Sequence, residues 1–201
     1  MKIKLAITGY PGVGKSTFSK FLSFYLNNSC LVEADKIGYI LLEDQKVIEF
    51  IEDYCPEALK DGNVDRKILG DKVFSSSENY YKYQNFIAPL MIDKLKEKIA
   101  LCEKKWDILI IDAALIYEWN ISDLFDEIIY IYSDNNLRYK VLQEKRNVNI
   151  ENYKKRETFL VSHIEKMRSS SIIIYSNFVE IDFKEKAKNL SKYISKKYLK
   201  K

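Results

Sequence analysis

The sequence of 201 residues predicts an α/β fold, with a parallel sheet of five strands and helices on both of its faces. Two observations lead to this expectation. Short apolar runs alternate along the chain with segments of helical periodicity, and some of these runs are apolar almost throughout, as strands covered on both faces are. A glycine-rich loop also joins the first strand to the first helix. In such sheets ligands bind beyond the carboxyl ends of the strands.

The predicted strands are short and mostly apolar. They cover residues 3–7, 30–34, 107–112, 127–132 and 172–175. Polar residues follow four of them, at the edge where a ligand is expected: Asp35, Asp112, Ser133 and Ser176. With the glycine-rich loop after the first strand, all five strand ends are expected to form the rim of one site.

Helical periodicity predicts the remaining elements. Residues 36–54 look helical and stop before Pro56, and Asp65 is suited to cap the helix that follows it. Residues 78–103 form the longest predicted helix, in which Pro89 is expected to bend or divide the chain. Shorter helices are expected over residues 135–145, up to Arg168, and in the lysine-rich tail.

The glycine-rich loop fits the P-loop pattern G-x-x-x-x-G-K-[ST] over residues 9–17. Its glycines let successive backbone N–H groups point inward, and the following helix adds its positive end, so the loop suits a polyphosphate. Lys15 can reach the β- and γ-phosphates, Ser16 can bind Mg²⁺, and Thr17 can reach the α-phosphate side. We therefore expect ATP with Mg²⁺ on Gly12, Val13, Gly14, Lys15, Ser16 and Thr17. A glycine-rich turn without a ligand is the alternative, and the agreement of motif and context disfavours it.

Two carboxylates after strands suit phosphoryl transfer. Asp35 can hydrogen-bond an acceptor hydroxyl and take its proton. Asp112 ends the strand that in many P-loop proteins carries the Walker B acid, so we expect it to hold Mg²⁺ through water. The alternative for both is a carboxylate that caps a helix at a junction between strand and helix. We expect the functional role for both because they follow strands at the ligand-binding edge.

Residues 146–156 are strongly charged and contain few apolar side chains, which favours a mobile lid over a core helix. Arg146 and Arg156 lie at the two ends of this segment. Arginines on a closing lid can offset the charge of the γ-phosphoryl group and help to exclude water. An ordinary solvated loop is the alternative, and the P-loop earlier in the chain makes the lid the better interpretation.

Other classes are disfavoured by composition. The net charge of +4 is modest, and the sequence contains neither a cluster of basic residues on one face nor a nucleic-acid-reading motif. We therefore expect no nucleic-acid partner. No apolar run reaches the length of a membrane span and no signal peptide is evident, so we expect a cytoplasmic protein without a membrane or an obligate protein partner. Three scattered cysteines, Cys30, Cys55 and Cys102, are expected to be reduced thiols. GTPase switch and base-reading motifs are absent from suitable places, and the chain is too short for a large motor ATPase.

Three further blocks, together with the P-loop, make the sequence similar to the dephospho-CoA kinase family, over about residues 2–177. Residues 32–37 resemble the family's strand ending in D-A-D, with the second aspartate on Asp35. Residues 65–90 are similar to its R-x-x-L, F and H-P pattern, and residues 112–118 to its D-x-P-L-L-F-E block. The resemblance implies transfer of a phosphoryl group from ATP to the ribose 3′-hydroxyl of dephospho-CoA. It also implies that Asp35 is the catalytic base and that Arg146 and Arg156 belong to the lid.

The sequence departs from that family at three places. Ala88 stands where the family has a histidine before Pro89, and Ala114 stands where it has a proline. Asn177 lies one place from the family's asparagine in the loop expected near the adenine of ATP. The role of Glu118, substrate contact or helix cap, stays open.

We therefore expect one P-loop kinase domain with a three-layer fold over residues 1–201. Its core covers residues 1–35, 104–145 and 169–201, with a helical acceptor-binding insertion at 36–103 and a lid at 146–168. The expected catalytic residues are Asp35, Lys15, Arg146 and Arg156, with Ser16 and Asp112 at the metal. The alternatives are a kinase for another nucleotide or small alcohol, and an inactive nucleotide-binding regulatory protein.

Overall fold

The computed structural model describes residues 2–60, 62–146 and 149–199, without the side chains of residues 145 and 146. The chain forms two compact units. The first unit comprises Met1–Glu33 and Lys98–Lys201, and the second comprises Ala34–Glu97.

A five-stranded sheet forms the centre of the first unit, in the order β2-β5-β1-β6-β7, and every neighbouring pair is parallel. The predicted α/β class and parallel sheet are confirmed. The central strands are buried on both faces because helices cover the sheet, which explains their continuous apolar sequences. The strands are β1 (Ile3–Thr8), β2 (Ser29–Glu33), β5 (Ile108–Asp112), β6 (Glu127–Tyr132) and β7 (Ile172–Tyr175).

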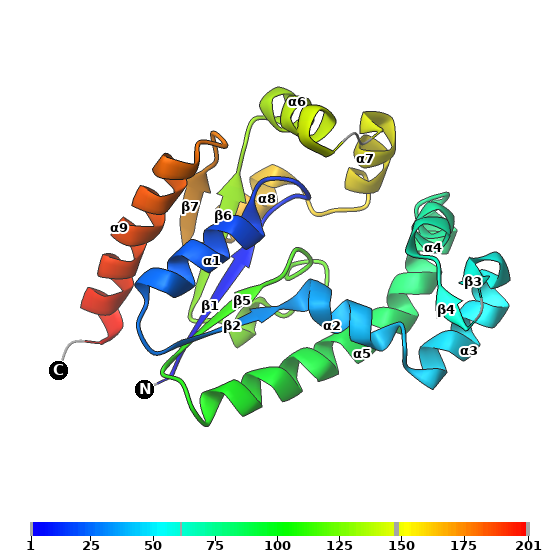
Figure 1. Cartoon of the computed structure of the whole chain (residues 1–201), viewed down its shortest axis with the longest axis horizontal. Coiled ribbons are helices and arrows are strands. Elements are labelled where there is room, and N and C mark those ends of the chain that lie inside the picture. Colours follow the sequence, from blue (N-terminus) through cyan, green and yellow to red (C-terminus); the bar gives the residue numbers. More distant parts are fainter. Residues whose placement is uncertain (1, 61, 147–148, 200–201) are drawn as a thin grey trace. The chain divides into compact units, whose positions relative to one another are not determined.

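Two helices from opposite ends of the chain lie together against the sheet. Helix α1 (Lys15–Tyr25) packs beside α9 (Glu180–Tyr198), and Figure 1 shows α9 beside β7 and α1 beside β1. Phe18 of α1 meets Phe183 of α9 edge to face, with ring centroids 5.4 Å apart. Both rings belong to the main apolar core, so the C-terminal helix holds the helix that follows the glycine-rich loop.

The first unit contains four further short elements between β5 and β7. They are η2 (Ser122–Leu124), α6 (Asn135–Arg146), α7 (Ile150–Glu157) and α8 (His163–Arg168). The charged segment predicted to be a lid is therefore partly helical. Asn149 begins α7 because its side chain accepts hydrogen bonds from the amides of Glu151 at 2.9 Å and Asn152 at 3.3 Å.

The second unit is mainly helical. Asp65 caps α4 as predicted, since its side chain accepts hydrogen bonds from the amides of Lys67 and Ile68. The predicted helix at 36–54 is two helices, because Asp44 caps a new one. Pro89 lies inside α5 and does not divide it. The elements of this unit are α2 (Ala34–Leu41), α3 (Gln45–Tyr54), η1 (Pro56–Ala58), β3 (Leu59–Lys60), β4 (Asn63–Val64), α4 (Arg66–Val73) and most of α5 (Ser77–Glu103).

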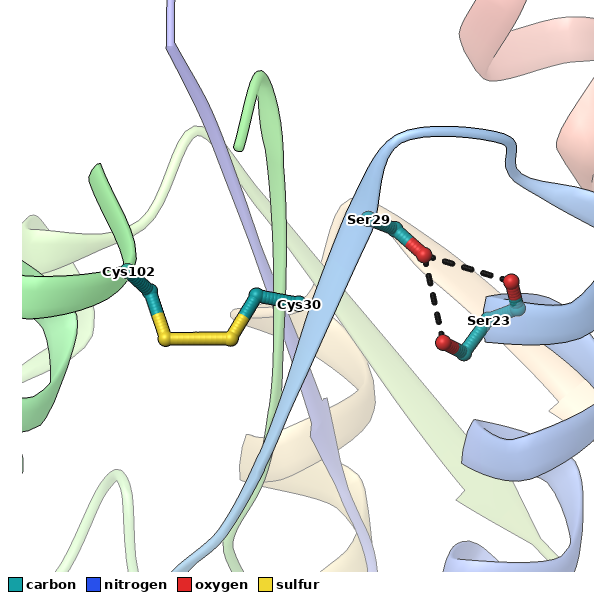
Figure 2. The surroundings of a disulfide bond; sticks show 4 residues. All are labelled: Ser23, Ser29, Cys30 and Cys102. Atoms are coloured by element: carbon teal, nitrogen blue, oxygen red, sulfur yellow. Dashed lines mark hydrogen bonds between the residues drawn. A yellow bond between two sulfur atoms is a disulfide. The ribbon is translucent and has the colours of Figure 1, made fainter. Parts of the chain in front are cut away.

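The strand β2 is attached on both of its sides, as Figure 2 shows. Cys30 forms a disulfide with Cys102 near the end of α5, and the Ser29 hydroxyl contacts Ser23 of α1 at 3.1 Å. The prediction of three reduced thiols is therefore wrong for Cys30 and Cys102, whereas Cys55 is free and buried. The sequence hid the pair because 72 positions separate the two cysteines, and only the fold brings their Cα atoms to 6.2 Å, within disulfide range.

Candidate functional site

The loop between β1 and α1 has the backbone that its glycines predict. Gly12 and Gly14 have φ angles of +84° and +96°, a left-handed conformation that other residues rarely adopt. Space is restricted as well, because a Cβ on Gly12 would lie 2.7 Å from the side chain of Leu142, and one on Gly14 would lie 2.9 Å from Phe183. The loop is therefore curled and closely backed by α6 and α9.

The start of α1 has the chemistry of an anion site. Its first turn carries no acidic residue and its N-cap, Gly14, offers no side-chain hydrogen bond, so the helix end presents its amides and its positive dipole end. Ser16 and Thr17 are exposed in that turn. The Nζ of Lys15 donates to the carbonyl of Tyr10 at 3.2 Å, so the lysine side chain extends across the loop.

The side chain of Val13 faces the protein interior. It is fully buried in the main core, and its amide donates to the carbonyl of Tyr10 at 3.4 Å. Of the six predicted nucleotide-binding residues, Val13 can therefore contribute only backbone to a ligand.

A pocket of about 270 Å³ opens beside the loop. Apolar and aromatic side chains from α6, from α9 and from the residue just before α9's N-cap form one part of its wall, and the loop with the start of α1 forms another. Asn177 is not one of its lining residues, and its side chain accepts a hydrogen bond from the amide of Val179 at 3.0 Å. The lining residues are Gly12, Gly14, Thr17, Val141, Leu142, Phe178, Glu180 and Phe183.

Asp112 ends β5 next to the strand that leads into the loop. It pairs in register with Ile7 of β1, its side chain is nearly buried, and the amide of Ala113 donates to the Ile7 carbonyl at 3.1 Å. Two of the predicted rim residues, Ser133 and Ser176, are fully buried. These two serines therefore lie below the surface that a ligand would contact.

The two arginines of the predicted lid have different standing in the structure. Arg146 is the last residue of α6, and its side chain lies outside the described residues. Arg156 lies in the last turn of α7 and is partly buried. The next residue, Glu157, forms a buried ion pair with Arg138 of α6.

Sequence reasoning missed Arg138. It lies in a polar helix whose composition resembles a solvated surface, and its partner comes 19 positions later. One signal was available, namely an arginine in the predicted core helix just before the lid and a glutamate inside the predicted lid. That signal is weak because the lid is rich in charges of both signs.

A second buried pair joins Glu118 and Lys166, whose atoms Oε1 and Nζ are 2.7 Å apart. Glu118 also accepts a hydrogen bond from the amide of Val161 at 3.0 Å. These contacts give Glu118 a structural partner, and they differ from the helix cap considered from the sequence. They attach the segment after β5 to α8 and to the residues just before it.

The only histidine of the chain, His163, packs against the rings of Tyr10, Tyr130 and Tyr132. The His163 ring stacks on Tyr10 with centroids 3.7 Å apart, and its Nδ1 is hydrogen-bonded to the Tyr130 hydroxyl. Burial, with a smaller effect of the nearby Arg138, lowers the pKa of His163 to about 4. The imidazole is therefore neutral near pH 7, and it packs against the ring of Tyr10 in the loop.

Asp35 belongs to the second unit. It is exposed in the first turn of α2, two residues after the last residue of β2. In the same unit, Arg66 lies over the ring of Tyr39, with the guanidinium carbon 4.1 Å from the centroid. Both line a pocket of about 430 Å³ that also includes Ile48 and Val64. This pocket offers a cation, an aromatic ring and apolar walls.

The described residues were compared with the requirements of a metal site and of a membrane-spanning helix. No group of three His, Cys, Asp or Glu residues there could hold a metal ion. A Mg²⁺ ion bound mainly through substrate phosphates needs only one or two protein oxygens, and the exposed Ser16 hydroxyl fits that requirement. None of the described helices is both long enough and apolar enough to cross a membrane.

Comparison with known proteins places this geometry in a family. A family model described as dephospho-CoA kinase matches residues 3–180. A dephospho-CoA kinase of Fusobacterium nucleatum is 32% identical over 176 residues, which cover 86% of this chain and 89% of that protein. The solved dephospho-CoA kinase from Campylobacter jejuni has a TM-score of 0.70 at 25% identity and covers 98% of this chain and 99% of that one. A shikimate kinase from Bacteroides thetaiotaomicron has a TM-score of 0.53 at 12% identity, with coverage of 96% and 98%, and shares the fold alone.

Proposed function

The chain belongs to the dephospho-CoA kinase family, and on that premise we propose how its residues divide the work of ATP-dependent phosphorylation of dephospho-CoA. The observation that carries the proposal is the curled loop before α1. Its glycines adopt conformations that expose backbone amides, and the helix end behind them attracts negative charge. A triphosphate is the ligand that such a loop suits.

ATP is proposed to bind with its phosphates on the loop and its base in the neighbouring pocket. Gly12, Gly14 and Thr17 line both the loop and the pocket, which makes the two continuous. Phe178 and Phe183 offer apolar surface to a flat heterocycle. Lys15 is already part of the loop through its bond to Tyr10, and it would exchange that carbonyl for phosphate oxygens.

A Mg²⁺ ion is proposed to accompany the nucleotide, held by the Ser16 hydroxyl and, through water, by Asp112. When bound, it would offset negative charge on the phosphates. Both residues lie in the first unit, Ser16 in the first turn of α1 and Asp112 at the end of β5.

The acceptor side is proposed to lie in the second unit. Asp35 would orient the ribose 3′-hydroxyl and accept its proton as the oxygen attacks the γ-phosphorus. The bond from that oxygen to phosphorus forms while the bond from phosphorus to the β-phosphate oxygen breaks, which leaves ADP. The pocket with Arg66 and Tyr39 offers a cation for an acceptor phosphate and a ring for its apolar parts.

Arg146 and Arg156 are proposed to approach the γ-phosphoryl group from the lid and to offset its charge during transfer. We also propose the cytoplasm as the location of the reaction, because ATP is abundant there. The division into one core, an acceptor-binding insertion and a lid remains part of this proposal.

The first experiment measures ADP formation with Mg-ATP and one acceptor at a time. Dephospho-CoA should support ADP release and yield a product with the mass of CoA, whereas pantetheine, nucleoside monophosphates and the absence of an acceptor should not. Release with another acceptor would favour a kinase of different specificity, for which Ala88 in place of the family's histidine is the motivating change. Absence of release with every acceptor would favour a nucleotide-binding regulatory protein.

A variant then tests the base. Asp35→Asn should lower kcat by roughly 10²-fold or more and leave ATP binding nearly intact, because the amide cannot accept the proton. The matched control is Asp53→Asn, which alters another exposed aspartate of the second unit. If Asp35→Asn turns over like the control, Asp35 has no part in the mechanism.

A further inference from the structure

Arg138 is the largest fully buried side chain among the described residues, and it lies in the first turns of α6. A buried guanidinium must be paired, because an isolated charge away from water is very costly. Both of its terminal nitrogens contact the carboxylate of Glu157, with Nη2 and Oε2 2.9 Å apart. The same Nη2 donates to Asn135 Oδ1 at 2.8 Å.

The other end of this contact is the P-loop itself. Nη1 of Arg138 donates to the carbonyl of Pro11 at 3.0 Å. Leu142, one helical turn further along α6, is the side chain that closely approaches Gly12. Two residues on one face of α6 therefore hold the middle of the loop, one by a hydrogen bond and one by packing.

Glu157 is the last residue of α7, and it follows Arg156 directly. Its carboxylate is only 9% exposed and accepts a further hydrogen bond from the Tyr139 hydroxyl at 2.6 Å. The end of α7 is therefore attached to α6 by a bidentate ion pair and one neutral donor. A fork of this geometry fixes orientation as well as distance.

We propose that Arg138 and Glu157 act as a positioning clamp that ties the end of α7 to the P-loop and thereby sets the direction of Arg156. Neither residue touches the reacting atoms. The clamp holds the backbone of Arg156 relative to Pro11 before ATP binds, so less ordering remains for the transfer step. This inference rests on the proposed role of Arg156.

The choice of an ion pair distinguishes positioning from stability. Replacing both partners of a buried pair by apolar groups of similar size is often neutral for folding, whereas the directional contacts disappear. The double variant R138M/E157M should therefore stay folded while it loses the orientation of α7. We expect kcat to fall by about 10- to 100-fold, with KM for ATP changed by less than about 3-fold, as for a misplaced catalytic group.

A double-mutant cycle with Arg156→Met separates positioning from a general structural role. If the clamp acts through Arg156, R138M/E157M should lower kcat by less than about 3-fold more in a background that already carries R156M. The control K94M/E97M removes an exposed ion pair of α5 and should retain the kcat of the unaltered chain. The variant R138K keeps the charge but cannot form the fork, and it should give an intermediate kcat; it also serves if the double variant does not fold.

The outcomes distinguish this inference from the proposed function. A folded R138M/E157M with kcat within about 3-fold of the unaltered chain overturns the clamp while Asp35 and Lys15 keep their roles. Independent, multiplicative losses in the R156M cycle also overturn it. If R156M alone leaves kcat unchanged, both the lid role of Arg156 and the clamp are wrong, and acceptor-dependent ADP release still reports on the function itself.

Discussion

Two buried ion pairs lie close to the Tyr10 ring, and the pKa values of their cations shift in opposite directions. Arg138 and Lys166 are both 0% exposed, and their partners Glu157 and Glu118 are 9% and 8% exposed. Both cationic groups lie over the ring, 5.5 and 5.4 Å from its centroid. Nevertheless, the pKa of Arg138 is raised and that of Lys166 is lowered. Burial alone does not explain this difference between the two pKa values, because both side chains are equally buried.

The contacts of each cation with its carboxylate partner explain why the two pKa values shift in opposite directions. Burial by itself disfavours both cations and lowers both pKa values. The guanidinium of Arg138 is hydrogen-bonded to both oxygens of Glu157, and the attraction of that carboxylate, followed by that of Tyr139, outweighs burial and raises the pKa. The ammonium of Lys166 lies 2.7 Å from one oxygen of Glu118 and 3.4 Å from the Ala114 carbonyl oxygen. The attraction of Glu118 does not outweigh burial, so the pKa of Lys166 is lowered.

Similar burial therefore accompanies a permanent charge on Arg138 and a removable charge on Lys166. An arginine does not lose its proton in proteins, so Arg138, which links the P-loop to α7, stays positively charged at every accessible pH. A lysine with a lowered pKa can become neutral. The pair between Glu118 and Lys166 attaches α8 to the segment after β5.

The largest expected effect comes from removing the partner of the permanent charge. Glu157→Leu leaves Arg138 buried and charged, and it should lower the free energy of unfolding by about 3–5 kcal/mol, measured by urea denaturation. R138M/E157L should recover most of this loss because no charge remains. If the single variant is as stable as the unaltered chain, the guanidinium reaches solvent and the pair is not buried in solution.

A smaller effect comes from His163, whose ring lies near both pairs. Its pKa is about 4 in the folded chain and near 6.5 when unfolded, so between these values only the unfolded chain binds the proton. The contribution to stability is present above pH 6.5 and is lost as the pH falls toward 4. The free energy of unfolding should decrease by about 3 kcal/mol over this range.

The matched variant for this prediction is His163→Gln, which keeps a hydrogen-bond acceptor for Tyr130. Carboxylates titrate in both proteins, so the difference between their urea-unfolding curves at each pH isolates the histidine. Parallel curves from pH 7 to pH 4 would contradict a buried, neutral imidazole.

The smallest expected effect comes from the removable charge. Glu118→Leu should lower the free energy of unfolding by about 2 kcal/mol at pH 7, less than Glu157→Leu, because Lys166 can release its proton. The pKa of Lys166 is lower in the folded chain than in the unfolded chain, so the free energy of unfolding should rise as the pH increases toward 10. Denaturation at pH 7 and pH 10 measures this recovery, and Glu157→Leu should show no comparable gain. An equal response of the two variants would remove the distinction between the pairs.

Local patterns predicted most of the fold. The apolar runs became the parallel strands, and the glycine spacing before Lys15 became a loop with left-handed glycines. Asp65 formed the expected helix cap. These features depend on residues close together in the chain, where periodicity and backbone preference act directly. The roles of Asp35, Arg146 and Arg156 stay predictions that the family resemblance supports.

The P-loop, the α/β class and the family can be read from the amino-acid sequence, because short contiguous motifs carry them and the spacing within each motif has a chemical reason. Only the tertiary structure decided which distant side chains meet. Cys30 pairs with Cys102 across 72 positions, and Arg138 binds both Pro11 and Glu157, from segments before and after it. A charged residue in a polar helix looks solvated until the packing of neighbouring elements buries it, so burial and pairing are properties of the whole fold.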